Sequence, residues 1–180
     1  TPPSLRFELA IEALSAGKHL LLEKPVCLNS EQILEIQKLS IKKQLSVAVD
    51  FEYRAVPHFL QANHLIKNGA IGDPWLVKID WLMSSRAEPT RPWDWYSDKD
   101  EGGGVLGALG THAFDTLHWL IGDTKTVMGN TYTSIKSRPE KVNKNLNKSV
   151  TSEDVVLTQL EIETAGNKSL IPAQVNLSAV

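Results

Sequence analysis

The chain has 180 residues, enough for one or two domains with a sizeable core. Its 19 basic and 21 acidic residues give a formal net charge of -2, which argues against a nucleic-acid-binding surface. A single cysteine, Cys27, excludes an internal disulfide framework and favours a reducing, cytoplasmic environment. No apolar run approaches the roughly 18 residues of a membrane span. These totals leave a globular enzyme or binding protein.

The N-terminal part alternates between helical and extended patterns. Apolar residues recur with a helical period over residues 4–16, Gly17 ends that helix, and a buried strand is predicted over 19–22. Asn29 is suited to cap a second helix, and alternation over 46–51 predicts a second strand. This order indicates a parallel α/β layer, with strands apolar enough to be covered on both faces.

The pattern changes near residues 51–56, where we place a domain boundary. The elements predicted beyond it are helices over 57–68 and about 106–120, a strand over 75–83, and long strands within 126–135, 155–163 and 168–180. Ala165-Gly166-Asn167 predicts a hairpin turn, and the basic stretch 136–148 a solvated loop. Long strands joined by hairpins indicate an α+β layer with a mainly antiparallel sheet.

Glu23-Lys24-Pro25 follows the first predicted strand directly. Lysine serves as an acid–base group when its surroundings lower its pKa, and the proline restricts the backbone before it. The carboxyl end of a strand is where open α/β sheets place ligands. The simpler alternative is a solvated Glu-Lys pair at the end of a strand.

A glycine-rich segment carries the second group of candidate residues. His112 and Asp115 lie one turn apart on the predicted helix, where a carboxylate can fix the tautomer of a histidine. Gly107 and Gly110 weaken that helix, which suits close approach of a backbone or ligand. The alternative is a structural histidine packed in the core. A metal site formed with His118 is disfavoured, because a separation of six residues places the two histidines about 120° apart around the helix axis.

Four segments in order carry a family resemblance: AGKHLLLEKP, YRAVP, NGAIGDP and GGGVLGALGTHAFDTLHWLIG. The sequence resembles the Gfo/Idh/MocA family of nicotinamide-dependent oxidoreductases along nearly its whole length. The resemblance implies that residues 1–53 end a Rossmann-type domain and that 54–180 form the substrate and oligomerisation domain with a large open sheet. It also implies that the glycine-rich phosphate loop precedes Thr1 and that further strands follow Val180, so we expect a protein about twice as long.

The resemblance also implies roles for individual residues. Lys24 and His112 would be catalytic, and no metal is expected. The cofactor, NAD or NADP, would contact Thr1, Pro2, Glu23, Lys24 and Pro25. The substrate would contact Arg54, Trp95, His112 and Asp115. On the residues alone, Trp95 and its neighbour Trp93 could stack on a sugar or simply plug the sheet.

One position departs from the family pattern. Many active relatives have an aspartate four residues before the histidine, where this chain has Ala108. Alanine can neither accept a proton nor bond to a hydroxyl. The main expectation is hydride transfer between NAD(P) and a CH–OH group of a sugar or cyclitol, in a homodimer or tetramer formed through the sheet. The alternatives are a catalytically drifted binding or scaffold protein and, more weakly, a metal-dependent hydrolase.

Overall fold

The computed structural model describes all 180 residues. Its N-terminal unit is a two-stranded parallel sheet with two helices, as the alternating pattern predicts. The elements are α1 (Pro3–Ser15), β1 (Leu20–Glu23), α2 (Ser30–Lys43) and β2 (Val47–Asp50). The Asn29 side chain caps α2 by accepting a hydrogen bond from the Gln32 amide (3.0 Å).

One face of this small sheet carries the packing. Leu20, Leu22 and Val47 pack against a buried cluster in which both helices take part; its members are Ala10, Leu14, Cys27 and Ile36. The opposite face is open, and Leu21 is 72% exposed. The expectation that both faces are covered is therefore wrong for this chain, because α1 and α2 contribute to one cluster.

The rest of the chain forms a larger unit. Its helical elements are the 3-10 turns η1 (Glu52–Ala55) and η2 (Trp95–Ser97), the π-helical turn η3 (Leu106–Gly110), and the helices α3 (Pro57–Lys67) and α4 (Thr111–Leu120). Its strands are β3 (Val77–Leu82), β4 (Gly122–Tyr132), β5 (Ser137–Pro139), β6 (Asn147–Ser149), β7 (Val155–Thr164) and β8 (Leu170–Ser178).

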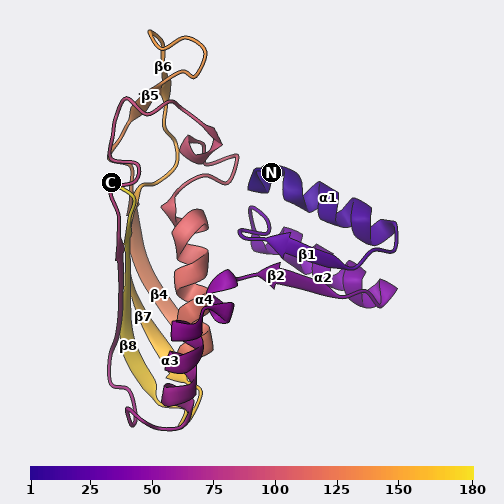
Figure 1. Ribbon diagram of the computed structural model, residues 1–180, viewed down its shortest axis with the longest axis vertical. Coiled ribbons are helices and arrows are strands. Elements are labelled where there is room, and N and C mark those ends of the chain that lie inside the picture. The colour runs from indigo at the N-terminus through magenta and orange to yellow at the C-terminus, as the bar shows by residue number, and fades with distance from the viewer.

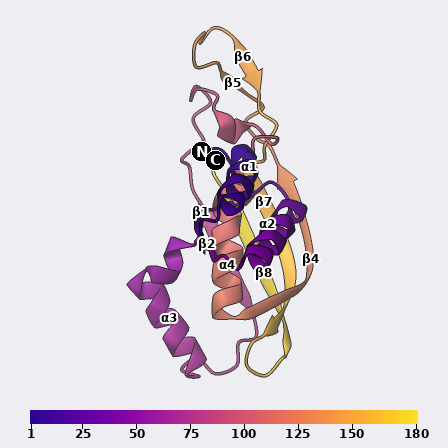
Figure 2. The ribbon, with the colours of Figure 1, turned by 90° about the vertical axis from the view of Figure 1, so that its right-hand side faces the viewer.

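The main sheet has the order β3-β8-β7-β4. The β4–β7 and β7–β8 pairs are antiparallel and β3–β8 is parallel, so the sheet is mixed. Its inner face packs against α4 through a core that includes Leu117, Leu160, Ile162 and Val175. Figures 1 and 2 show α3, α4 and the N-terminal unit on one side of this sheet, while no helix covers the other side.

Two details differ from the sequence-based expectations. The predicted helix over 106–120 begins with the π-helical turn η3 and becomes α-helical only at Thr111. The predicted loop over 136–148 contains the β5–β6 hairpin, which projects beyond the main sheet (Figure 1). Its strands have three residues each, too short for a clear alternating pattern.

Candidate active site

The loop that carries Lys24 is held by Arg6, a residue that the sequence analysis did not single out. The Arg6 guanidinium donates to the carbonyls of Glu23 (3.0 Å) and Pro25 (2.6 Å), on either side of Lys24. It also donates to the Thr1 carbonyl, at 3.1 and 2.9 Å. The Lys24-Pro25 peptide bond is cis. One side chain therefore joins the start of α1 to both flanks of the lysine.

Lys24 reaches from this loop to the segment before α4. Its Nζ donates to the Ala108 carbonyl in η3 at 2.8 Å. Burial lowers the pKa of Lys24, and the carboxylates of Glu52 and Glu23 oppose that shift. An ammonium group has three donors, so two remain for other partners.

The glycines at 102–104 allow close packing just before η3. A Cβ at Gly102 would lie 2.7 Å from Cβ of Pro3, so the loop packs directly against the start of α1. Gly104 has φ +104° and lies against the Glu153 side chain, whose Oε1 accepts from the Leu106 amide at 2.8 Å. Glu153 thus fixes the start of η3, the turn whose Ala108 carbonyl accepts from Lys24.

His112 lies in α4, directly after η3, and is surrounded by aromatic rings from other elements. It is buried, and its ring centroid is 6.0 Å from Phe51, 4.6 Å from Tyr53 and 6.3 Å from Trp81. Its Nδ1 has no hydrogen-bond partner, and its Nε2 lies 3.5 Å from Oε1 of Glu52. Burial and then Lys24 lower the pKa of His112, which favours the neutral imidazole, while nearby carboxylates act in the opposite direction.

Asp115 does not form the expected contact with His112. Its two oxygens accept from Arg54, at 2.9 Å from Nε and 2.6 Å from Nη2. Both carboxylate oxygens of Asp115 are therefore bound by Arg54, and these hydrogen bonds raise the pKa of Arg54. Both residues line a cavity of about 480 Å³ with Glu52 and Asp50. The carboxylate that faces His112 is instead Glu52, which the sequence analysis missed.

Trp95 lies apart from Lys24 and His112. Trp95 begins η2, and its ring contact is with Tyr96, at 6.0 Å between centroids. No hydrogen bond or ring contact joins Trp95 to Lys24 or His112. Thr1 and Pro2 precede α1, where Arg6 holds the Thr1 carbonyl.

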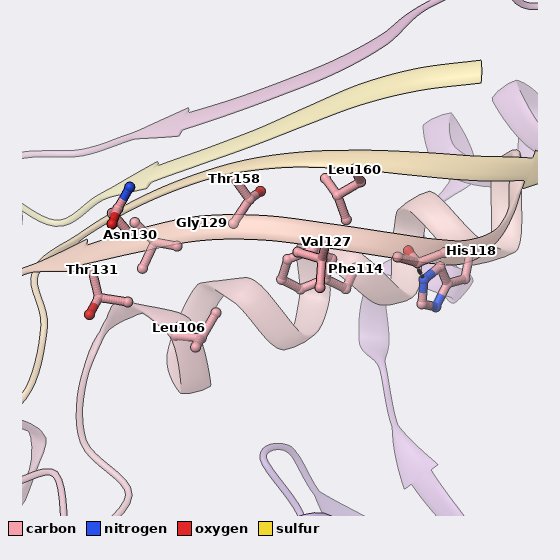
Figure 3. A pocket seen from close by; sticks show the side chains of 11 residues that line it. Leu106, Phe114, His118, Val127, Gly129, Asn130, Thr131, Thr158 and Leu160 are labelled. Atoms are coloured by element: carbon pink, nitrogen blue, oxygen red, sulfur yellow. Dashed lines mark hydrogen bonds between the residues drawn. The ribbon is translucent and has the colours of Figure 1, made fainter. Parts of the chain in front are cut away.

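The chain shows no cluster of three or more side chains able to hold a metal ion. His118 faces away from His112, and its Nε2 lies 2.9 Å from Oγ1 of Thr124. It belongs to a second cavity, of about 420 Å³, between α4 and the inner face of β4 and β7 (Figure 3). Neither Lys24 nor His112 lines that cavity. None of the helices has the length and apolar character needed to cross a membrane.

Comparison with known proteins adds family models to this geometry. Residues 1–51 match the model of an oxidoreductase family with an NAD-binding Rossmann fold. Residues 59–171 match the model of the GFO/IDH/MocA C-terminal domain. Together the two matches span both units of the structure.

Individual relatives agree with these matches. An uncharacterised oxidoreductase of Synechocystis sp. is 42% identical over the whole chain, which covers 47% of that protein. Levoglucosan dehydrogenase of Pseudarthrobacter phenanthrenivorans is 34% identical over 77% of the chain and 36% of its own length. The structure of a levoglucosan dehydrogenase with NADH and L-sorbose superimposes with a TM-score of 0.89 and 30% identity, over 99% of this chain and 47% of that one.

The chain thus spans about half or less of the length of these relatives. It contains the Glu23-Lys24-Pro25 loop, the helix with His112 and the mixed sheet. Since a family model covers well over half of its residues, the chain belongs to the GFO/IDH/MocA family of oxidoreductases.

Proposed function

We propose that the protein is an NAD(P)-dependent oxidoreductase that acts on a CH–OH group of a sugar, sugar derivative or cyclitol. The observation that carries the proposal is the approach of Lys24 to the segment that bears His112, with Nζ 2.8 Å from the Ala108 carbonyl. Relatives named as levoglucosan dehydrogenase, inositol 2-dehydrogenase and D-glucoside 3-dehydrogenase support this substrate class.

The residues of the chain fit the nicotinamide end of such a cofactor. Lys24 follows the carboxyl end of β1 and Phe51 that of its parallel neighbour β2, where open α/β sheets bind ligands. Lys24 has two donors to spare and makes no ion pair within 4 Å. We assign cofactor contacts to Thr1, Pro2 and Glu23-Lys24-Pro25. The bound nicotinamide would accept or supply the hydride.

The protein side chains would handle the proton and the charge. In oxidation, His112 would take the proton of the substrate hydroxyl as the carbon gives up its hydride, leaving a carbonyl. Lys24 would orient the oxygen and stabilise its developing negative charge. Arg54, Asp115 and Trp95 are proposed to contact the rest of the substrate, with Arg54 and Asp115 lining the cavity of about 480 Å³.

Assembly and location belong to the same proposal. We propose domains at residues 1–53 and 54–180, and a homodimer or tetramer formed through the sheet face that carries no helix. The unpaired, buried Cys27 fits a reducing, cytoplasmic location.

The test is turnover by the full-length protein over a panel of sugars and polyols, followed by NAD(P)H absorbance. We expect Lys24→Ala and His112→Ala each to lower kcat by at least about 100-fold, because each removes a group that acts on the reacting oxygen. Lys125→Ala, on the exposed part of β4, is the matched control and should keep activity.

Ala108 favours a second candidate, a binding or scaffold protein that has lost catalysis. Its side chain has no acid–base group, and its carbonyl is occupied by Lys24. Cofactor binding without turnover of any panel member would support this candidate. Turnover that depends on added zinc and not on the cofactor would contradict both candidates.

A further inference from the structure

The carboxylate facing His112 comes from η1, a segment outside the helix that carries the histidine. Oε1 of Glu52 lies 3.5 Å from Nε2 of His112. The His112 side chain is 4% exposed and that of Glu52 is 54% exposed. Glu52 therefore connects a buried imidazole to the solvent.

Four charged groups act on His112, and only Glu52 is within ion-pair distance of the ring. Lys24 lies toward η3 and donates to the Ala108 carbonyl. Asp115, on α4 itself, is taken up by Arg54. Glu23 is exposed at the end of β1. Of the three carboxylates, Glu52 has the largest effect on the pKa of His112, which it raises.

The surroundings of Glu52 leave its carboxylate free to act. It forms no hydrogen bond with another side chain, and the His112 ring is its only partner within ion-pair distance. It lines the cavity of about 480 Å³ together with Arg54 and Asp115, which neutralise each other. Phe51 and Tyr53, on either side of Glu52 in the sequence, both pack against the His112 ring. The position of Glu52 is thus tied to that of the imidazole.

We infer that Glu52 acts through His112, by taking the proton from the protonated ring and passing it to solvent. In oxidation, His112 Nε2 takes the substrate hydroxyl proton and becomes an imidazolium. The imidazolium gives that proton to the Glu52 carboxylate, and the resulting carboxylic acid releases it to water. Only the proton moves in this step, and His112 and Glu52 return to their starting forms. The role rests on the proposed function.

Kinetics of the full-length protein test the role. In Glu52→Gln, kcat for oxidation should fall roughly three- to fivefold, the factor expected for one half-exposed ion pair, with KM nearly unchanged. The acidic limb of the pH profile should move to lower pH, because Gln no longer favours the imidazolium. Glu52→Asp keeps a carboxylate, so its kcat and its acidic limb should lie between those of Glu52→Gln and the parent. A Gln variant with unchanged kcat and an unchanged acidic limb would overturn the inference.

A second measurement does not depend on turnover. NMR titration of the His112 ring in the full-length protein should show a lower pKa in Glu52→Gln than in the parent. Glu35→Gln, an exposed site on α2, is the control and should leave that pKa unchanged. An unchanged His112 pKa in Glu52→Gln would overturn the inference. If that pKa falls but no substrate is turned over, the pairing stands and the proposed function fails.

Discussion

A single guanidinium fixes the geometry of the Lys24 loop. Arg6 donates four hydrogen bonds to three carbonyls, those of Thr1, Glu23 and Pro25. Burial lowers the pKa of Arg6, but a guanidinium stays protonated throughout the physiological range. Since two of these carbonyls flank Lys24, the position of the ammonium group depends on Arg6.

Replacing Arg6 should loosen this loop. We expect Arg6→Ala to lower the free energy of unfolding by about 1–3 kcal/mol, because three carbonyls, of which that of Pro25 is partly buried, lose a charged donor. Urea denaturation measures this change. Lys43→Ala is the control: it removes one bond to the Ser15 carbonyl at an exposed site, and should cost less than about 0.5 kcal/mol. Equal losses in the two variants would contradict the role of Arg6.

The buried imidazole of His112 should make stability depend on pH. Burial and Lys24 lower its pKa in the folded chain below the ordinary value of 6.5. As the pH falls through 6.5, the unfolded chain therefore binds the proton first. The contribution of His112 to the free energy of unfolding is therefore fully present above pH 6.5. It is lost as the pH falls toward the folded-state pKa, and the free energy of unfolding changes by at most about 1.4 kcal/mol per pH unit.

The variant that isolates this effect is His112→Gln. Urea unfolding at about pH 7.5 and about pH 5.5 should show a smaller loss of stability on acidification in His112→Gln than in the parent. His64→Gln, on the exposed side of α3, should leave the difference unchanged. A parent and a His112→Gln variant with the same pH dependence would contradict the buried, neutral histidine.

The sequence was informative at the residue level where a local pattern exists. Lys24 follows a strand and precedes a proline, and His112 lies on a helix rich in glycine; both patterns are contiguous. Arg6 was missed because Glu23 and Pro25, whose carbonyls it binds, lie 17 and 19 residues away in the sequence. Glu52 was missed because His112 lies 60 residues away. Asp115 was assigned to His112 by helical spacing alone, and a distant Arg54 binds it instead.

At the level of elements, the turn before α4 is the unusual one. The π-helical η3 places the Ala108 carbonyl where Lys24 donates to it, and Thr111 Oγ1 donates to the Gly107 carbonyl at 2.8 Å. A π-helical turn widens the helix, and such turns are frequent at functional sites. Its two glycines have different surroundings, which allows a matched test.

Gly110 and Gly107 should respond differently to alanine. A Cβ at Gly110 would lie 2.9 Å from Leu106 Cδ1 and 3.2 Å from Leu177 Cδ1. We expect Gly110→Ala to cost about 1–3 kcal/mol by overpacking η3 against β8. At Gly107 the nearest atom is the Gly102 carbonyl oxygen at 3.4 Å, so Gly107→Ala should be neutral or stabilising by up to about 1 kcal/mol. Thermal unfolding monitored by circular dichroism compares the two; a reversed order would contradict the packing described here.

Periodicity in the sequence predicts which segments are helices and strands. It does not predict the π-helical geometry of η3 or the way in which the strands pair. The alternation that predicts β3 is seen in its burial, with Val77, Ile79 and Trp81 turned inward. The π-helical form of η3 depends on contacts with Glu153 and Lys24, which come from distant parts of the chain. The mainly antiparallel character of the sheet agrees with the expectation, whereas the parallel pairing of β3 with β8 is non-local and could not be read from local patterns.

On the scale of the whole molecule, the two faces of the main sheet differ. The inner face holds the core and α4, whereas the outer face carries large apolar side chains in contact with solvent, from all four strands: Leu82, Met128, Leu157 and Leu170. Met128 alone is 67% exposed. In the strand register these side chains alternate with polar ones such as Gln159, Glu163 and Asn176, and a second copy of the same face would cover them.

The proposed dimer gives the last prediction. Leu157→Glu puts a charge on the outer face of β7, between Asn130 of β4 and Asn176 of β8, and should shift the protein to monomers because a desolvated carboxylate would oppose association. Light scattering at high concentration measures the mass. Val142→Glu is the control, at a site 97% exposed between β5 and β6 and away from that face, and should leave the mass unchanged. A parent protein that is monomeric at high concentration would contradict the dimer, and dissociation by Val142→Glu alone would place the interface on the hairpin instead.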